Sequence, residues 1–240
     1  MEPIGAFKRQ ALLPGDLNRL DRETGMLLAT VDSLAEDELR GPSLCEGWSR
    51  AQVIGHLIGN ADAMANLAHW ARTGEETPMY ASKEARNAAI DERAALPRQQ
   101  LKEELHAASD RLRAALDELS GGVDTEVLQA TFGPLNAWAV PALRITEVIL
   151  HHHDLDTLWT LEEADMDAQE DGLLLCVGMS SGKDWGSGVR LITDEGEDLV
   201  LGAGETTLRG GRDALLAWLA RGQTDGVRGE PPARPDPTLG

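Results

Sequence analysis

The stretch SRAQVIGHLIGNADAMANLAHWARTG, residues 49–74, decides the fold because it contains a long helix together with both of its end signals. Ser49, followed three residues later by Gln52, has the form of a capping box. Gly74 is typical of a helix end, so the stretch predicts a helix over about 50–72. This helix is strongly apolar and must be buried against other elements, which favours a bundle of helices.

Three further long segments predict the partners of this helix. Apolar residues recur at roughly helical spacing through residues 15–39 and 97–119, and the sequence Ser-Gly-Gly ends the second segment. A fourth long helix is expected over about 141–159, with Pro141 in its first turn. Residues 82–96 form an additional helical stretch. Together these segments predict a helical domain over residues 1–160, built as a four-helix bundle.

The sequence changes character after residue 160. Residues 161–200 hold eleven acidic and two basic residues. The run VRLITDEGEDLVLGAG, residues 189–204, contains two β-rich segments separated by Asp-Glu-Gly, which predicts a hairpin. A short helix is expected before the hairpin, and a third strand and an amphipathic helix ending at Gly222 after it. We therefore predict a mostly α protein in which a small α+β domain spans residues 161–222 and a Pro/Gly-rich tail spans 223–240.

Composition narrows the classes of function. The 240-residue chain has 22 basic and 41 acidic residues and a formal charge of −19, which argues against binding to nucleic acid or to anionic membranes. No segment is long and apolar enough for a signal peptide or a membrane span. Cys45 and Cys176 form no Cys-x-x-Cys pair, which favours a reducing, cytoplasmic location. We expect a monomer, because domains of this size can bury their own cores.

A cluster of three histidines lies in the sequence EVILHHHDLD, residues 147–156, and holds half of the histidines of the chain. Glu147 and His151 are four residues apart and therefore lie on one face of a helix, where they could chelate one ion. His152 and His153 point roughly 100° and 200° further around, so they cannot join the same site. We expect His152 to be exposed and His153 to be either a neighbour on the helix or a residue that contacts the metal ligands. We also expect His69 and His106 to be surface residues.

A third ligand has to come from another helix, and His56 is the best candidate. It lies in the apolar sequence QVIGHLIGNA, where a histidine is costly unless its nitrogens are paired. Two histidines and one glutamate are a donor set of catalytic zinc sites, and bundles build such sites from separate helices. The alternatives remain that His56 is a hydrogen-bonded core residue and that Glu147 and His151 are a surface pair.

Residues near this trio provide further candidates. Arg144 and Asp154 lie on the same helix as Glu147 and His151, three residues before the first and three after the second, and we assign both as candidate cofactor-binding residues. Asp154 could orient an imidazole or cap a neighbouring turn. Cys45 is a weaker candidate ligand, since a lone thiol is more often simply buried. Cys176 is expected to be a core residue.

Several of these stretches together resemble the mycothiol-dependent maleylpyruvate isomerase family. The resemblance rests on LCEGWSRAQVIGHLIGNADAMANLAHWARTGEETPMY (residues 44–80), on LRITEVILHHHDL (residues 143–155) and on ALLAWLARG (residues 214–222). It covers most of the chain, roughly residues 15–222. It implies a DinB-like helical bundle followed by a small sterol-carrier-like α+β domain.

The resemblance also assigns site residues. The metal ligands of the family match His56, Glu147 and His151, with Zn²⁺ as the expected metal and mycothiol as the thiol cosubstrate. Arg86 matches an arginine that is functional in the isomerases. A second functional arginine is expected near the end of the last helix, where Arg221 stands in the order Ala-Arg-Gly rather than the more usual Gly-Arg.

The chemistry that follows is a cis–trans isomerisation. Zinc with an open coordination position can deprotonate a thiol, and the thiolate would add to the cis double bond of maleylpyruvate and then be eliminated to leave the trans isomer. Local arginines would hold the carboxylates of the substrate. The alternatives are a mycothiol S-transferase acting on another electrophile, a non-catalytic binding protein, and, less favoured, a metal hydrolase that activates water.

Overall fold

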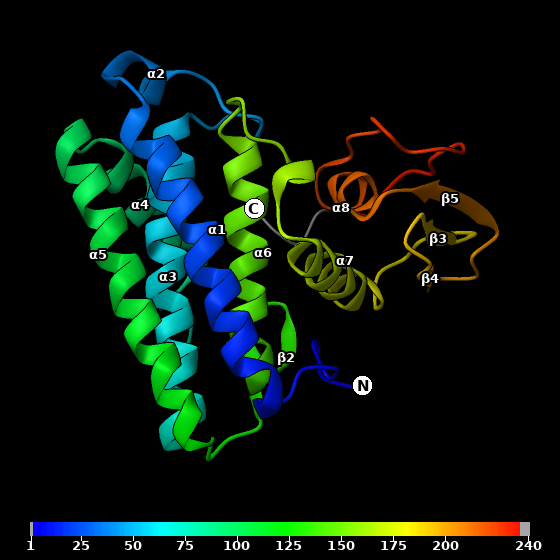
Figure 1. Cartoon of the computed structure of the whole chain (residues 1–240), viewed down its shortest axis with the longest axis horizontal. Coiled ribbons are helices and arrows are strands. Elements are labelled where there is room, and N and C mark those ends of the chain that lie inside the picture. The colour runs from blue at the N-terminus through cyan, green and yellow to red at the C-terminus, as the bar shows by residue number, and fades with distance from the viewer. Residues whose placement is uncertain (1, 236–240) are drawn as a thin grey trace. The chain divides into compact units, whose positions relative to one another are not determined.

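The computed structural model describes residues 2–235 and contains eight α-helices and two small sheets in that range (Figure 1). The chain divides into two compact units, Met1–Trp159 and Thr160–Gly240. The fold class is therefore the predicted one, mostly α with an α+β part. No helix in the described range is long and apolar enough to cross a membrane.

The first unit is a bundle of four long helices, α1, α3, α5 and α6 (Figure 1). Helix α3 contacts both α5 and α6, and α1 contacts the same two helices, so the four close around one apolar core. The shorter helix α4 packs on α3. The bounds are α1 (Leu13–Ser33), α2 (Glu36–Arg40), α3 (Arg50–Thr73), α4 (Lys83–Ala94), α5 (Arg98–Asp117) and α6 (Val140–Asp154), with short 3₁₀ turns η1 (Gln10–Leu12), η2 (Glu118–Gly121) and η3 (Ala137–Ala139).

Helix α3 has the ends that its sequence predicts. The Ser49 hydroxyl accepts a hydrogen bond from the Gln52 backbone N–H, and the Gln52 side chain accepts one from the Ser49 N–H at 2.9 Å. Gly74 ends the helix with a φ of +74°, which favours glycine. Helix α4 approaches α3 closely at Gly55, where a Cβ atom would lie 2.9 Å from the Ile90 carbonyl oxygen. The small residue therefore lets α4 lie beside the helix turn that carries His56.

Helix α6 ends at Asp154, five residues before the end that the sequence predicts at about residue 159. Asp156 has a φ of +52°, a left-handed conformation that stops the helix. The side chain of Arg50, on α3, donates to the Leu155 carbonyl and, at 3.0 Å, to the Asp156 carbonyl. These bonds satisfy carbonyl groups at the end of α6. Because the donor belongs to a different helix, the sequence pattern along α6 does not reveal them.

A two-stranded hairpin precedes α6, and the sequence analysis did not predict it. Strands β1 (Val127–Ala130) and β2 (Gly133–Asn136) pair antiparallel, with Ala130 opposite Gly133 across the turn. Gly133 has a φ of +126°, a conformation that glycine alone adopts readily. The strands are only four residues long, so their alternation of polar and apolar residues gives a weak signal.

The second unit combines a three-stranded sheet with two helices. Strand β3 (Val189–Thr193) pairs antiparallel with β4 (Asp198–Leu201), as the hairpin pattern predicts, and parallel with β5 (Thr206–Gly210). Residues 223–235 include a bridge between Arg228 and Arg209, so this part of the predicted tail is attached to the unit, whereas residues 236–240 lie outside the described range. The remaining elements are η4 (Leu161–Glu163), α7 (Met166–Ser180) and α8 (Arg212–Arg221).

An ion pair joins the β3–β4 turn to the start of α8. The carboxylate of Glu197 accepts hydrogen bonds from two nitrogens of Arg212, one of them Nε at 3.1 Å, and from the Thr193 hydroxyl. The Arg212 guanidinium is the main cause that lowers the pKa of Glu197 from its usual 4.5 to about 2. The folded state therefore favours the charged carboxylate, and its stabilising effect is present above pH 4.5.

We predict that Glu197→Gln lowers the free energy of unfolding at pH 7 by about 1–2 kcal/mol, because the variant loses charge-assisted bonds that are largely shielded from solvent. Since the pKa of Glu197 is lowered in the folded state, the wild-type chain loses this contribution as the pH falls from about 5 towards 2. Urea unfolding of both proteins between pH 7 and pH 3 should show the difference narrowing with acid. A difference that is constant with pH would contradict the assignment.

Candidate metal centre

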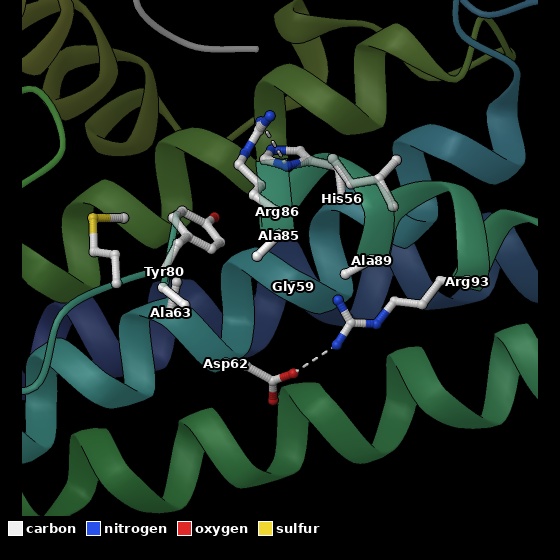
Figure 2. A pocket seen from close by; sticks show the side chains of 12 residues that line it. His56, Gly59, Asp62, Ala63, Tyr80, Ala85, Arg86, Ala89 and Arg93 are labelled. Atoms are coloured by element: carbon white, nitrogen blue, oxygen red, sulfur yellow. Dashed lines mark hydrogen bonds and ion pairs between the residues drawn. The ribbon is translucent and has the colours of Figure 1, made fainter. Parts of the chain in front are cut away.

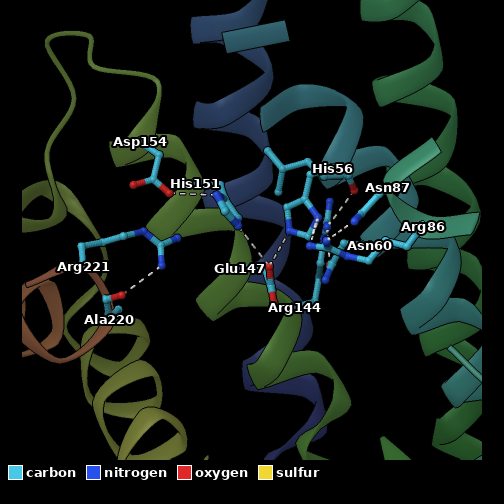
Figure 3. Close-up of polar contacts among 11 residues, drawn as sticks. His56, Asn60, Arg86, Asn87, Arg144, Glu147, His151, Asp154, Ala220 and Arg221 are labelled. Atoms are coloured by element: carbon cyan, nitrogen blue, oxygen red, sulfur yellow. Dashed lines mark hydrogen bonds and ion pairs between the residues drawn. The ribbon is translucent and has the colours of Figure 1, made fainter. Parts of the chain in front are cut away.

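Two helices bring the three predicted ligands together inside the bundle. His56 comes from α3, and Glu147 and His151 come from successive turns of α6. The Oε2 atom of Glu147 lies 3.1 Å from His56 Nε2 and 3.4 Å from His151 Nε2. Figure 3 shows the carboxylate between the two imidazoles. One donor atom from each residue lies within 4.8 Å of the others, and all three residues are buried.

The donor set has the spacing and the chemistry of a tetrahedral metal site. Zinc binds nitrogen and carboxylate oxygen at about 2.0–2.2 Å, so the donors of a tetrahedral site are about 3.3 Å apart. The two distances to the Glu147 oxygen are close to this value. In addition, His151 Nε2 is a buried nitrogen that makes no well-aligned hydrogen bond among residues 2–235, although Glu147 Oε2 lies 3.4 Å away. The residues present therefore fit a divalent metal with a fourth position open.

Burial and mutual contact shift the pKa values of the trio in different directions. Burial, together with the nearby His151, lowers the pKa of His56 to about 4. Burial also opposes ionisation of Glu147, yet contacts with His151 and His56 hold the pKa of this carboxyl well below its usual range. Without a metal, the carboxylate of Glu147 therefore contacts a neutral His56, and these are the forms in which these two residues bind a metal.

A second set of groups surrounds the other side of His151. Its Nδ1 atom lies 2.8 Å from Asp154 Oδ2, and both side chains are fully buried. Burial disfavours the imidazolium, but contacts with Asp154, Cys45 and Glu147 together raise the pKa of His151 to about 10. Cys45 is half-buried, and its thiol lies within 4.8 Å of donor atoms of His151 and Asp154. Asp154 therefore contacts the ring nitrogen that faces away from Glu147, in the manner of a carboxylate that orients a metal-binding histidine.

Arg144 is buried in the same core, with 1% of its surface exposed. Its Nη1 atom donates to the Leu57 carbonyl oxygen at 3.0 Å and to Asn60 Oδ1 at 2.7 Å, both on α3 (Figure 3). Burial lowers the pKa of Arg144 to about 10, so the side chain remains charged at neutral pH. These bonds join α6 to α3 one turn from Glu147 and next to His56, which fixes the two halves of the donor set relative to each other.

The other histidines occupy different environments. The expectation that His152 is exposed is wrong, because the residue is buried, stacks on Trp159 with ring centroids 4.0 Å apart, and shares a 2.7 Å hydrogen bond with Thr30. His153 is half-buried. The side chains of His69 and His106 are about half exposed, as predicted. Helix α6 is therefore buried on more of its surface than an amphipathic helix that buries only one face. The spacing of its apolar residues alone did not show this.

Arg86, in α4, lies on the outer side of His56. Its Nη2 atom donates to His56 Nδ1 at 3.1 Å, which assigns the remaining imidazole proton to Nε2 in this arrangement. Arg86 also lines a cavity of about 190 Å³ between α3 and α4, which Figure 2 shows with His56 and Tyr80 at its wall. Its Nη1 atom donates to the amide oxygen of Asn87 at 3.2 Å, and within the described range Arg86 forms no salt bridge with a carboxylate.

The last two predicted residues lie in the second unit. Arg221 is the final residue of α8, and its Nη1 atom donates to the Ala220 carbonyl at 3.3 Å. Cys176 is buried within α7, as expected of a core residue.

Sequence reasoning missed three residues that surround the trio, namely Trp48, Asn60 and Tyr80. Asn60 lies four residues after His56, so its position on the same face of the helix was a usable signal. Trp48 and Tyr80 stand immediately before, and two residues before, the N-cap residues of α3 and α4. Their approach to Arg86 depends on how the two helices pair, and a single sequence does not contain that information.

These features define the class of the protein. It is a helical-bundle protein with a buried donor set of two histidines and one glutamate and a small additional α+β unit. Residues 20–156 match the family model of the mycothiol maleylpyruvate isomerase N-terminal domain, so the chain belongs to this family. A solved structure of the mycothiol-dependent maleylpyruvate isomerase is 28% identical, with a TM-score of 0.85 over 93% of this chain and 96% of that chain. A histidine-to-alanine mutant of that isomerase matches over the same shares with 27% identity and the same TM-score. No match was found among curated proteins.

We predict that Asn60→Ala lowers the free energy of unfolding by about 2 kcal/mol, because it removes an acceptor from a buried guanidinium. Denaturant unfolding of the purified chain measures this change. Asn66→Ala, on the same helix, is the matched control, since the Asn66 side chain makes an exposed bond to the Pro78 carbonyl. A loss in the Asn60 variant no larger than in the Asn66 variant would show that the buried bond has little importance.

Proposed function

We propose that this chain is a zinc- and mycothiol-dependent enzyme that isomerises maleylpyruvate or a closely similar dicarboxylate. The observation that carries the proposal is the buried convergence of His56, Glu147 and His151 at distances suited to one tetrahedral ion. Membership of the isomerase family and similarity along 93% of the chain to a mycothiol-dependent isomerase support the choice of reaction.

The residues of the chain have distinct tasks in this proposal. His56, Glu147 and His151 hold the ion, which when bound would supply an open position where a thiol loses its proton. Asp154 orients the His151 ring, and Arg144 holds α6 against α3 beside the site. Both residues thus act on the cofactor site through the ligands rather than by contact with the ion.

The reaction itself needs a thiolate and a means of holding a dianion. The thiolate of the cosubstrate adds to the cis double bond, the resulting single bond rotates, and elimination of the same thiolate gives the trans isomer. Arg86 is suited to bind a substrate carboxylate, because its guanidinium has no carboxylate partner in the described part of the chain and lines a cavity beside His56. Arg221 is proposed as the second substrate-binding arginine from the family resemblance.

The wider assignments are proposals as well. Residues 1–160 would form the metal-binding domain and residues 161–222 the sterol-carrier-like domain of a cytoplasmic monomer. Each unit has its own buried apolar residues, and both cysteines are free thiols, which agrees with a reducing compartment. Size-exclusion chromatography tests the oligomeric state directly.

The first test is the metal content of the untagged protein by elemental analysis. We expect about one zinc per chain in the wild type and less than about a tenth of that in His56→Ala, which removes one of three ligands. His106→Ala is the control, because its half-exposed side chain lies far along the sequence from the trio and pairs with Asp32. Absence of metal from the wild type after zinc has been supplied would refute the proposed centre.

The second test separates isomerisation from S-transfer. An isomerase returns the thiol after each turnover, so we expect the concentration of free mycothiol to stay constant while many equivalents of maleylpyruvate react. A transferase would consume one thiol for each product molecule formed. Thiol titration and product analysis on the same samples give both quantities, and stoichiometric thiol loss would favour the S-transferase alternative.

A further inference from the structure

Two aromatic rings flank the guanidinium of Arg86. The Cζ atom lies 6.0 Å from the ring centroid of Trp48 and 5.9 Å from that of Tyr80. These distances are within the range at which a cation is attracted to the face of an aromatic ring. Trp48 also lies 5.8 Å from the His56 ring, so the arginine, the aromatic residues and the candidate metal ligand form one cluster.

Both rings are held by the backbone around them. The Trp48 N–H donates to the Cys45 carbonyl at 3.0 Å, and the Trp48 carbonyl accepts from the Ser43 N–H at 3.0 Å and from the Ser43 hydroxyl at 2.9 Å. Tyr80 follows the buried Met79 and precedes the Ser82 cap of α4. Trp48 therefore comes from a hydrogen-bonded turn before α3, and Tyr80 comes from the segment that leads into α4.

The hydrogen bond from Arg86 to His56 can form with only one tautomer of the neutral imidazole. It requires a lone pair on His56 Nδ1. When Nε2 binds a metal ion, the proton of the neutral ring is on Nδ1, and a guanidinium, which has donors only, cannot bond to it. A metal-loaded protein would therefore lose this bond, and within the described range Arg86 would keep the 3.2 Å hydrogen bond from Nη1 to Asn87 Oδ1 but no salt bridge.

We propose that Trp48 and Tyr80 are positioning residues that keep Arg86 beside the metal centre after His56 has bound its ion. The two rings hold the guanidinium between them, so that Nη2, once released from His56, can bind a substrate carboxylate in the cavity between α3 and α4, while Nη1 keeps its 3.2 Å hydrogen bond to Asn87 Oδ1. This inference rests on the proposed function, since it requires an ion on His56 and an anionic ligand at Arg86.

The test measures binding of succinate, a dicarboxylate that cannot isomerise, to the zinc-loaded protein by calorimetry. We expect Trp48→Leu and Tyr80→Leu each to weaken succinate binding about fivefold, and Trp48→Phe and Tyr80→Phe to stay within about twofold of wild type because a ring remains. Zinc affinity, measured by competition with a chelator, should be unchanged in all four variants. Trp70→Leu, at the opposite end of α3, is the matched control.

The decisive measurement repeats Trp48→Leu in an Arg86→Met background. If Trp48 acts through Arg86, the double variant binds succinate no more weakly than Arg86→Met alone. Equal losses from Trp48→Leu in both backgrounds would overturn the positioning role. If Arg86→Met weakens succinate binding but Trp48→Leu does not, the positioning role alone is overturned. If Arg86→Met leaves succinate binding unchanged, the proposed role of Arg86 in binding the carboxylate is overturned as well.

Discussion

The carboxylate of Glu147 is shared between two imidazoles on two helices, and the arrangement of the bundle around it depends on that contact. A buried carboxylate is costly unless it is hydrogen-bonded or paired. His151 contacts it from the same helix, so α3 has to come close enough to α6 for His56 to reach it as well. Arg144 adds a second connection between the same helices through Leu57 and Asn60. The polar groups at the centre of the bundle therefore fix the register of α3 and α6, which apolar packing alone would define less sharply.

The proposed reaction requires the site to recognise an anion within a protein that carries a formal charge of −19. The field of the whole chain repels a dicarboxylate, but salt screens this field beyond about 8–10 Å. Attraction must therefore come from cations in direct contact with the ligand. Arg86 meets this requirement, since aromatic rings rather than carboxylates flank its guanidinium and do not neutralise its charge.

The features that could be predicted from the sequence are those set by neighbours along one helix. The four-residue spacing of Glu147 and His151, the apolar surroundings of His56, and the capping box at Ser49 are all local signals, and the structure brings these residues together as expected. Features that depend on contacts between helices were missed. Helix α6 ends at Asp154, where Asp156 turns left-handed and Arg50 of α3 bonds the carbonyls of the two residues after the helix. His152 is buried against Thr30 and Trp159 rather than exposed.

The two imidazoles of the donor set differ in what surrounds their second nitrogen. His151 Nδ1 faces the carboxylate of Asp154, an acceptor that orients the ring and increases its strength as a ligand. His56 Nδ1 faces the guanidinium of Arg86, which offers donors only. Helix α6 thus supplies two donors and the group that orients one of them, whereas α3 supplies a donor whose second nitrogen lies beside the cavity at Arg86. In the proposed metal centre, Asp154 therefore orients the ligand His151, whereas the ligand His56 has its second nitrogen beside Arg86 and the cavity.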